Sequence, residues 1–460
     1  METIERLFES WGNAVWGPPM IVLLLGTHIF LTIRLRFIQR YIGKAIKLSL
    51  GRSREGTGDI SQFGALTTAL ASTIGTGNIV GVGTAIAAGG PGAVFWIWIT
   101  GVFGIATKYA EAVLSIKYRV VNRQGFMAGG PMYVLERGMK QRWLGVLFAL
   151  LMCITAFGIG NMVQANAIAT MAEQTFGVPP WITGLVIMTL TAVVILGGIK
   201  SISAWCERLV PIMAIVYAGG CIAILAMNFR ELPQTLRLIL DGAFSGHAAA
   251  GGFLGAGVRE TIRYGIARGL FSNESGLGSA PIVAAAAQTK NPVRQALVSS
   301  TGTFWDTVVV CALTGLVLVN SGKWTIEGVH GAALSNAAFS QMPVIGPLVL
   351  TFGLLTFVFS TIIGWSYYGE KATEYLFGVR YVRFYRWLWV ICVMFGSLAT
   401  LRLVWSFADI ANALMAIPNL ISLVVLSGVI AAETRTYLWS GNIETPADEG
   451  GPAATSESPR

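Results

Sequence analysis

Two groups of small and polar residues interrupt long apolar runs, and their types suit the binding of a small charged ligand. The first run, LTTALASTIGTGNIVGVGTA, holds Gly75, Thr76, Gly77 and Asn78 at its centre. The second, GIARGLFSNESGLGSAPIVAAAA, holds Glu274 at its centre. Glycine weakens a helix, and an unwound helix frees backbone N–H and C=O groups. Freed amides favour a carboxylate, whereas freed carbonyls favour a small cation or an ammonium group.

Composition places both groups inside a membrane. Of the 460 residues, 54% are apolar and 12% are charged, with a mean hydropathy of +0.64. Soluble domains carry roughly 25% charged residues, so these charges are too few to cover a soluble surface. The composition excludes a soluble enzyme, a nucleic-acid binder and a disordered scaffold. It predicts an all-α polytopic membrane protein. The net charge of +9 is then explained by Lys and Arg in the connections between spans, and it does not indicate a polyanionic partner.

A helix that crosses a bilayer needs about 20 apolar residues, and the sequence contains eleven such runs. The predicted spans are 15–36, 61–85, 93–115, 143–171, 180–198, 208–228, 257–286, 300–320, 345–369, 385–403 and 410–431. These spans divide the chain into an N-terminal helix with a basic cytoplasmic connection (1–60), a first five-helix repeat (61–228), a second, inverted five-helix repeat (255–431) and a disordered cytoplasmic tail (432–460).

The distribution of Lys and Arg predicts the orientation of these spans. With eleven spans, 23 of the 32 Lys and Arg fall in the odd-numbered connections and the C-terminal tail, and 7 fall on the other side. Because cytoplasmic loops are enriched in Lys and Arg, we expect the N-terminus outside and the C-terminus in the cytoplasm. The expected location is the cell inner (plasma) membrane.

The positions of the two interrupted spans predict a transporter. When the first span is set aside, each interrupted span begins a set of five, and the two sets cross the membrane in opposite directions. Paired broken helices in inverted halves are typical of secondary transporters with a site at the midplane. Close packing of helices through small residues is the alternative explanation of the glycines. A channel is a further alternative, although it needs no such pairing.

Five motifs, in order between about residues 15 and 431, resemble the alanine or glycine:cation symporter family, also called sodium:alanine symporters. They are GALTTALASTIGTGNIVGVGTAIAAGGPGAVFWIW, AGGPMYVLERG, GGIKSIS, FSNESGLGSAPIVAAAA and WSYYGEKATEYLFG. The resemblance implies a leucine-transporter-type fold, five plus five inverted helices with one extra N-terminal helix. It also implies sodium-coupled uptake of small neutral amino acids, chiefly alanine and glycine. Ser275 and the pair Val283–Ala284 depart from the family pattern, which has alanine and alanine-histidine there, and this bears on substrate preference.

The resemblance also assigns residues to the substrate. It places the substrate carboxylate on the amides of Thr76 and Gly77, where we expect Gly77 to need backbone angles that are costly for other residues. It implies a substrate contact for Gln164 in the fourth span, although a buried amide also serves to join helices. Phe271 and Trp365 are predicted to be apolar walls that limit side-chain size, with packing or lipid contact as the alternative.

The ninth span offers a cation site. Phe357, Ser360 and Thr361 follow the i, i+3, i+4 spacing that presents a carbonyl and two hydroxyls at one height of a helix. With the carbonyls of Ala71 and Ile74 beside the first break, they complete a five-oxygen shell, by analogy with the shared sodium site of the fold. Bonding of the hydroxyls back to their own helix is the alternative. We expect no cofactor besides sodium as the coupling ion, because the three His and five Cys lack ligand-like spacing.

Charged residues inside spans are costly and few. Lys108 and Glu111, three apart, are predicted to neutralise each other. Asp306 and Glu274 have no obvious sequence partner, and Glu274 is open to gating, to pairing with Arg268 or to carrying a proton. The sequence contains no nucleophile–base pair and no set of metal ligands with a spacing that would indicate an enzyme. The prediction is a sodium-coupled symporter with a proton-coupled one as the alternative; its partners are the amino acid, sodium and the bilayer, with no obligate protein partner.

Overall fold

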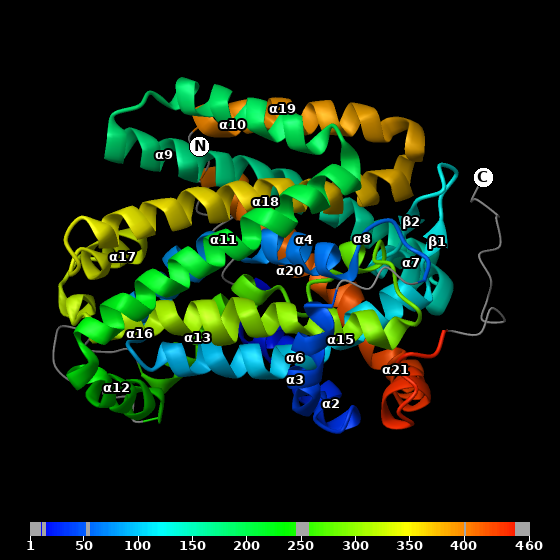
Figure 1. The fold of residues 1–460 in the computed structure, drawn as a ribbon, viewed down its shortest axis with the longest axis horizontal. Helices are drawn as coiled ribbons and strands as arrows, with labels where there is room; N and C mark the ends of the chain where they lie inside the picture. The colour runs from blue at the N-terminus through cyan, green and yellow to red at the C-terminus, as the bar shows by residue number, and fades with distance from the viewer. Residues whose placement is uncertain (1–10, 12–14, 52–55, 245–256, 400–401, 447–460) are drawn as a thin grey trace.

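The computed structural model describes residues 11, 15–51, 56–244, 257–399 and 402–446, and most of them are helical (Figure 1). The α-helices are α2 (Pro18–Arg34), α3 (Ile42–Ser49), α4 (Gln62–Thr73), α5 (Val82–Gly89), α6 (Ala93–Lys117), α7 (Pro131–Tyr133), α8 (Arg142–Thr155), α9 (Val163–Phe176), α10 (Pro180–Ile195), α11 (Gly198–Met227), α12 (Leu232–Phe244), α13 (Val258–Asn273), α14 (Pro281–Ala284), α15 (Pro292–Thr303), α16 (Ala312–Asn320), α17 (Gly331–Phe339), α18 (Ile345–Phe377), α19 (Val382–Leu398), α20 (Arg402–Val425) and α21 (Ser427–Thr434).

Shorter elements continue or join these helices. The π-helical segments are η2 (Gly77–Gly81), η3 (Val134–Gly138), η4 (Ala156–Met162), η6 (Phe304–Cys311) and η9 (Arg435–Trp439). The 3-10 turns are η1 (Ile38–Tyr41), η5 (Phe229–Glu231), η7 (Lys323–Thr325) and η8 (Val379–Tyr381). The strands β1 (Val120–Val121) and β2 (Met127–Ala128) form an antiparallel pair with Val120 opposite Ala128.

Within the described residues, 6 helices are long and apolar enough to cross a bilayer, or up to 8 if each of two bent pairs is one span. The six are Ala93–Lys117, Arg142–Phe176, Gly198–Met227, Pro292–Asn320, Ile345–Phe377 and Ala408–Val425, and the bent pairs are Pro18–Arg34 with Ile38–Ser49 and Gln62–Thr73 with Gly77–Gly89. The predicted spans 180–198 and 385–403 overlap α10 and α19, of 16 and 17 residues. The predicted span 257–286 contains α13, of 16 residues, followed by the short helix α14. The count of eleven and the inverted repeat stay predictions.

Some glycines allow close packing of helices, which was the alternative explanation of the glycine-rich runs. A Cβ at Gly269 of α13 would lie 2.1 Å from Thr100 Oγ1 of α6, and one at Gly265 would lie 2.6 Å from the Ala93 carbonyl oxygen. These glycines let two helices approach, as expected in membrane interfaces. The long helix α18 packs against α4, α8, α9 and α11.

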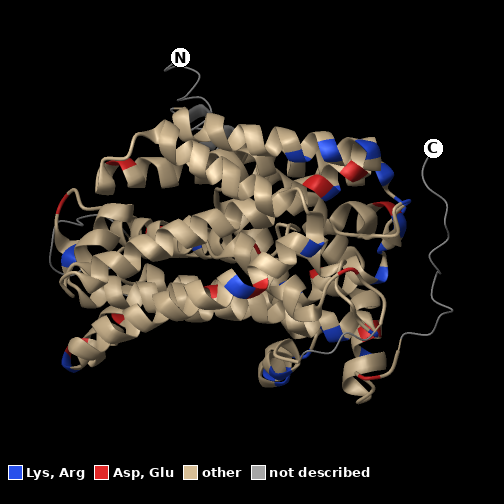
Figure 2. Ribbon diagram, turned by 45° about the horizontal axis from the view of Figure 1, so that its top comes forward, with Lys and Arg blue, Asp and Glu red and all other residues tan. Residues whose placement is uncertain are grey.

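Charge is unevenly distributed over the bundle. Figure 2 shows Lys and Arg gathered toward its right-hand end, in agreement with the uneven sequence count. The chain stays helical through η9 to Trp439, past residue 432, where the sequence predicted the tail to begin. Arg6, Arg52, Arg54 and Arg460, which entered the count, lie outside the described residues, as does 447–460 of the predicted tail.

Candidate functional site

The first element of the site is the broken helix formed by α4 and α5. Ser61 is the N-cap of α4, and its Oγ accepts the Gly64 amide at 2.8 Å. Ile74 leaves the helix with a ψ of 98°. The chain then resumes as η2 and α5 at a bend of 53°. Amides that begin a helical segment have no intrahelical partner, so the break exposes backbone donors at the predicted position.

Asn78 fixes the first break and joins it to the second half of the chain. Its Oδ1 accepts the Gly75 amide at 2.8 Å, and its Nδ2 donates to Asp306 Oδ1 at 2.7 Å. Asp306 Oδ2 accepts from Ser272 Oγ at 3.0 Å and from Thr307 Oγ1 at 2.7 Å. Asp306, without an obvious partner in the sequence, therefore links both broken helices.

The second break lies between α13 and α14 and depends on left-handed backbone. Glu274, Gly276 and Gly278 have φ of 54°, 92° and 85°. Glycine adopts such angles freely, whereas at Glu274 they cost about 1–2 kcal/mol. Ser279 Oγ donates to the Glu274 carboxylate, and no ion pair joins Glu274 to Arg268 in the described chain. Of the three roles left open for Glu274, pairing with Arg268 is thus absent from this conformation.

Glu111 of α6 braces the second break. Its Oε1 accepts the amides of Gly276 and Gly278, both at 3.1 Å, and Asn419 Nδ2 at 2.7 Å. Lys108 Nζ is buried and has no hydrogen-bond partner within the described residues. Lys108 and Glu111 therefore form no hydrogen bond or ion pair with each other among the described residues, and their mutual neutralisation stays a prediction. The i, i+3 spacing places the two side chains near each other, but the Glu111 carboxylate turns to the unpaired amides of the break.

A cavity of about 20 Å³ lies between the two breaks, which is room for roughly one water molecule. All five residues predicted to contact the substrate line this cavity: Thr76, Gly77, Gln164, Phe271 and Trp365. The structure thus brings together positions from the first break, η4 to α9, α13 and α18. Their roles in binding stay predictions.

Two unpaired acceptors border the cavity. Gln164 Nε2 donates to the Ile159 carbonyl of η4 at 3.0 Å, while Gln164 Oε1 is buried with no donor among the described residues. Asn412 Oδ1 of α20 is in the same situation and also lines the cavity. Sequence reasoning missed Asn412, although an amide within the apolar run ANALMAIP was a usable signal. Such acceptors suit an ammonium group.

The aromatic residues lie against backbone that lacks side chains. A Cβ at Gly160 would lie 2.5 Å from Trp365 Cβ, so a glycine is needed there for the indole to reach its place beside Tyr368. A Cβ at Gly77 would lie 3.4 Å from Phe271 Cδ1. Gly77 does not have positive φ. The expectation that it needs costly backbone angles is therefore wrong, and a Cβ at this position would meet only ordinary contacts.

The predicted cation ligands meet at the edge of the cavity. Ser360 Oγ donates to the Ala71 carbonyl at 3.1 Å and to the Phe357 carbonyl at 2.9 Å. Thr361 Oγ1 also donates to the Phe357 carbonyl at 2.9 Å and lines the cavity. Ile74 is buried where α4 ends. Four of the five residues are joined by hydrogen bonds. The bonds to Phe357 are also those expected if the two hydroxyls only bond back to their own helix.

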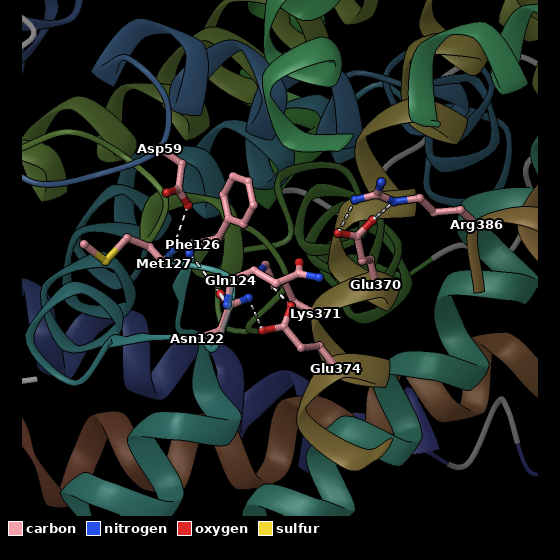
Figure 3. A network of polar contacts seen from close by, with 9 residues as sticks. All are labelled: Asp59, Asn122, Gln124, Phe126, Met127, Glu370, Lys371, Glu374 and Arg386. Carbon is pink, nitrogen blue, oxygen red and sulfur yellow. Dashed lines mark hydrogen bonds and ion pairs between the residues drawn. The ribbon is translucent and has the colours of Figure 1, made fainter. Parts of the chain in front are cut away.

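A polar network ties the β1–β2 segment to α18 (Figure 3). Asn122 Nδ2 donates to Glu374 Oε1 at 2.8 Å, and Lys371 Nζ pairs with Glu374 Oε2 at 2.8 Å. Asp59 Oδ2 accepts the Met127 amide at 2.8 Å, while burial raises the pKa of this carboxyl. The network holds the chain before the first break close to the end of α18.

A second ion pair of the same region fixes α18 to α19. Arg386 Nε and Nη2 donate to the two carboxylate oxygens of Glu370 at 2.7 and 2.9 Å. The Glu370 side chain is 7% exposed, so its charge depends on this two-pronged partner.

The fold is shared with a transporter of known structure. The crystal structure of a mutant of the Eremococcus coleocola manganese transporter superposes with a TM-score of 0.50 at 13% identity, covering 86% of this chain and 85% of the other. Together with the apolar helices, this shared fold defines the class as a multi-pass helical membrane protein.

Sequence comparison identifies the family. The sequence model of the sodium:alanine symporter family matches residues 1–447, and the chain belongs to that family. The sodium/alanine symporter AgcS of Methanococcus maripaludis is 52% identical over 94% of this chain and 96% of its own. A probable sodium/glutamine symporter, GlnT of Bacillus subtilis, is 36% identical over 95% and 91%.

Proposed function

We propose that this protein carries small neutral amino acids, alanine and glycine, into the cell together with sodium by alternating access. The observation that carries the proposal is the cavity between the two breaks, which pairs backbone donors with unpaired acceptors. The amides at Thr76 and Gly77 suit a carboxylate, and Gln164 Oε1 and Asn412 Oδ1 suit an ammonium group. A zwitterion requires both within one small space.

The walls support a small side chain. Phe271 and Trp365 border the cavity, and Gly160 lets Trp365 approach closely. The cavity of about 20 Å³ is smaller than any amino acid, so binding requires the breaks or the aromatic walls to move. This requirement supports alternating access over a permanently open pore.

Sodium is the proposed coupling ion because the oxygens at Ala71, Phe357, Ser360 and Thr361 lie together beside the first break. Hard monovalent cations prefer such neutral oxygen ligands. Proton coupling is the second candidate, favoured by the carboxylate of Glu274, which lines the same cavity.

Counterflow tests the proposal. Proteoliposomes loaded with unlabelled alanine should concentrate labelled alanine transiently, and external glycine should suppress this. A Gln164→Leu variant, which keeps the shape and removes the acceptor, should lose counterflow, whereas Thr356→Ala on the outer part of α18 should retain it. Labelled alanine that merely equilibrates in the wild type would indicate a channel and refute a carrier.

A further inference from the structure

A second cavity lies at the surface, where the two ends of the described chain meet. Its volume is about 220 Å³, and it is bordered by Arg34 and Arg36 at the end of α2 and by Arg435 and Trp439 of η9. In Figure 1 the blue α2 and the red α21 lie near each other, and the two helices are in contact. Small residues of α21, such as Gly428, leave the space open.

The positive charge of the three arginines of this pocket is not compensated within the described part of the chain. None of them forms an ion pair with an acidic residue within the described chain. Glu433, the acidic residue nearest in sequence to Arg435, is paired with Lys117 instead. The Arg36 guanidinium lies 4.6 Å from the ring centroid of Trp439, which holds it at the pocket without reducing its charge. Among the residues that the structure describes, the pocket therefore lacks a negative partner.

The orientation of the spans in the membrane does not require the arginines to converge on one pocket. Positive charge near a span suffices to set orientation wherever it lies in the connection. Here, however, guanidinium groups about 400 positions apart in the sequence converge on one cavity. Guanidinium groups bind phosphate oxygens in a two-pronged manner, and a 220 Å³ cavity accommodates a phosphate with part of its ester.

The surface beside the pocket is apolar and exposed. Ile33 on α2 is 63% exposed, Phe37 just after it 59%, and Val425 at the end of α20 61%. In a membrane protein such side chains face acyl chains, and tryptophan marks the level of the headgroups. Trp439 therefore places the three arginines at headgroup depth, with hydrocarbon directly alongside.

We propose that this pocket binds one anionic phospholipid, with its phosphate on Arg34, Arg36 and Arg435 and its acyl chains along α2 and α20. Basic pockets between spanning helices bind such headgroups. The lipid would hold the N-terminal helix α2 to the C-terminal η9. This site is separate from the cavity between the two breaks and does not depend on the transported substrate.

Native mass spectrometry of the purified full chain tests this site. The probes are phosphatidylglycerol, cardiolipin and phosphatidylcholine added at equal concentration, with glycerol phosphate as a competitor without acyl chains. The test variant is Arg34→Gln with Arg435→Gln. The matched control is Lys44→Gln with Lys47→Gln, which removes two exposed charges from α3, outside the pocket.

The expected result is one retained anionic lipid in the wild type and the control, and about 30-fold weaker retention in the test variant. Phosphatidylcholine should not be retained, and glycerol phosphate should not displace the lipid. Equal loss in both double variants, equal retention of all lipids, or displacement by glycerol phosphate would each overturn the proposal. If the double variant is not monodisperse, Arg435→Gln against Lys47→Gln gives the same comparison.

Discussion

The Ser360 hydroxyl donates to the Ala71 carbonyl oxygen at 3.1 Å, although the two residues are 289 positions apart. This contact joins the unbroken helix α18 to the last turn of α4 before the first break. A cation bound at this point would have both residues as ligands, and it would hold the break in one position relative to α18. The position of the first break would then affect both ion binding and substrate binding.

Thr361 tests this cation site. Thr361→Ala removes a hydroxyl that borders the cavity between the two breaks, so the sodium concentration for half-maximal alanine uptake should rise about tenfold. The preference for alanine over glycine should stay unchanged. Thr356→Ala, four and five positions before Ser360 and Thr361 on the same helix, is the control. An unchanged sodium requirement in Thr361→Ala would remove this residue from the site.

Trp365 is predicted to exclude large side chains. Trp365→Ala should let leucine compete with alanine about tenfold better or more, because one methylene in a pocket is worth roughly 1–3 kcal/mol. Inhibition of labelled alanine uptake by leucine, valine and glutamine measures the effect, with Trp387→Ala at an exposed position of α19 as the control. If the inhibition constants do not change, Trp365 does not limit substrate size.

Variants of Gly77 and Gly83, in the same broken span, distinguish a glycine that is needed for substrate binding from one that is needed for helix packing. A Cβ at Gly77 meets ordinary contacts at 3.4 Å, whereas a Cβ at Gly83 would lie 2.6 Å from the Gly331 carbonyl oxygen. Gly77→Val should therefore give normal detergent-solubilised yield and lose alanine binding, because the branched side chain occupies the carboxylate position. Gly83→Val should lose yield.

Both quantities are measured on the same preparations of the glycine variants. Normal yield together with normal alanine affinity in Gly77→Val would contradict a substrate site at the first break. Poor yield in Gly77→Val with near-normal affinity in the folded fraction would favour helix packing instead.

The pair of Arg386 and Glu370 is predicted to stabilise the fold. Arg386→Ala leaves a carboxylate that is 7% exposed without its partner, which costs about 3–5 kcal/mol. Thermal unfolding in detergent should show a lower midpoint, and Arg386→Ala with Glu370→Gln should recover part of it. Arg383→Ala, exposed on the same helix, should have little effect. A midpoint equal to the wild type in Arg386→Ala would contradict a stabilising role.

Sequence patterns predicted the two helix breaks, but they did not predict the partners of the carboxylates beside them. Glycines with polar neighbours inside apolar runs predicted both breaks, because few other features unwind a helix at membrane depth. The partners of Asp306 and Glu111 could not be predicted, since both carboxylates bind groups on other helices. Local spacing therefore paired Glu111 with Lys108, whereas in the fold it binds the amides of the second break.

The backbone angles and the helix lengths could not be predicted from the sequence either. Glycine at position 77 signals either unusual angles or lack of space, whereas the structure shows neither a positive φ nor a Cβ contact shorter than 3.4 Å there. The number of spans depends on helix lengths that apolar runs do not set, as α10 and α19 show with 16 and 17 residues.

Alanine uptake into proteoliposomes, with and without an inward sodium gradient at constant pH, tests the central claim most directly. Labelled alanine should accumulate above equilibrium with external sodium chloride and stop accumulating when choline replaces sodium. Undiminished accumulation in choline, or accumulation driven by a pH gradient alone, would contradict sodium coupling at Ser360 and Thr361 and would favour the carboxylate of Glu274.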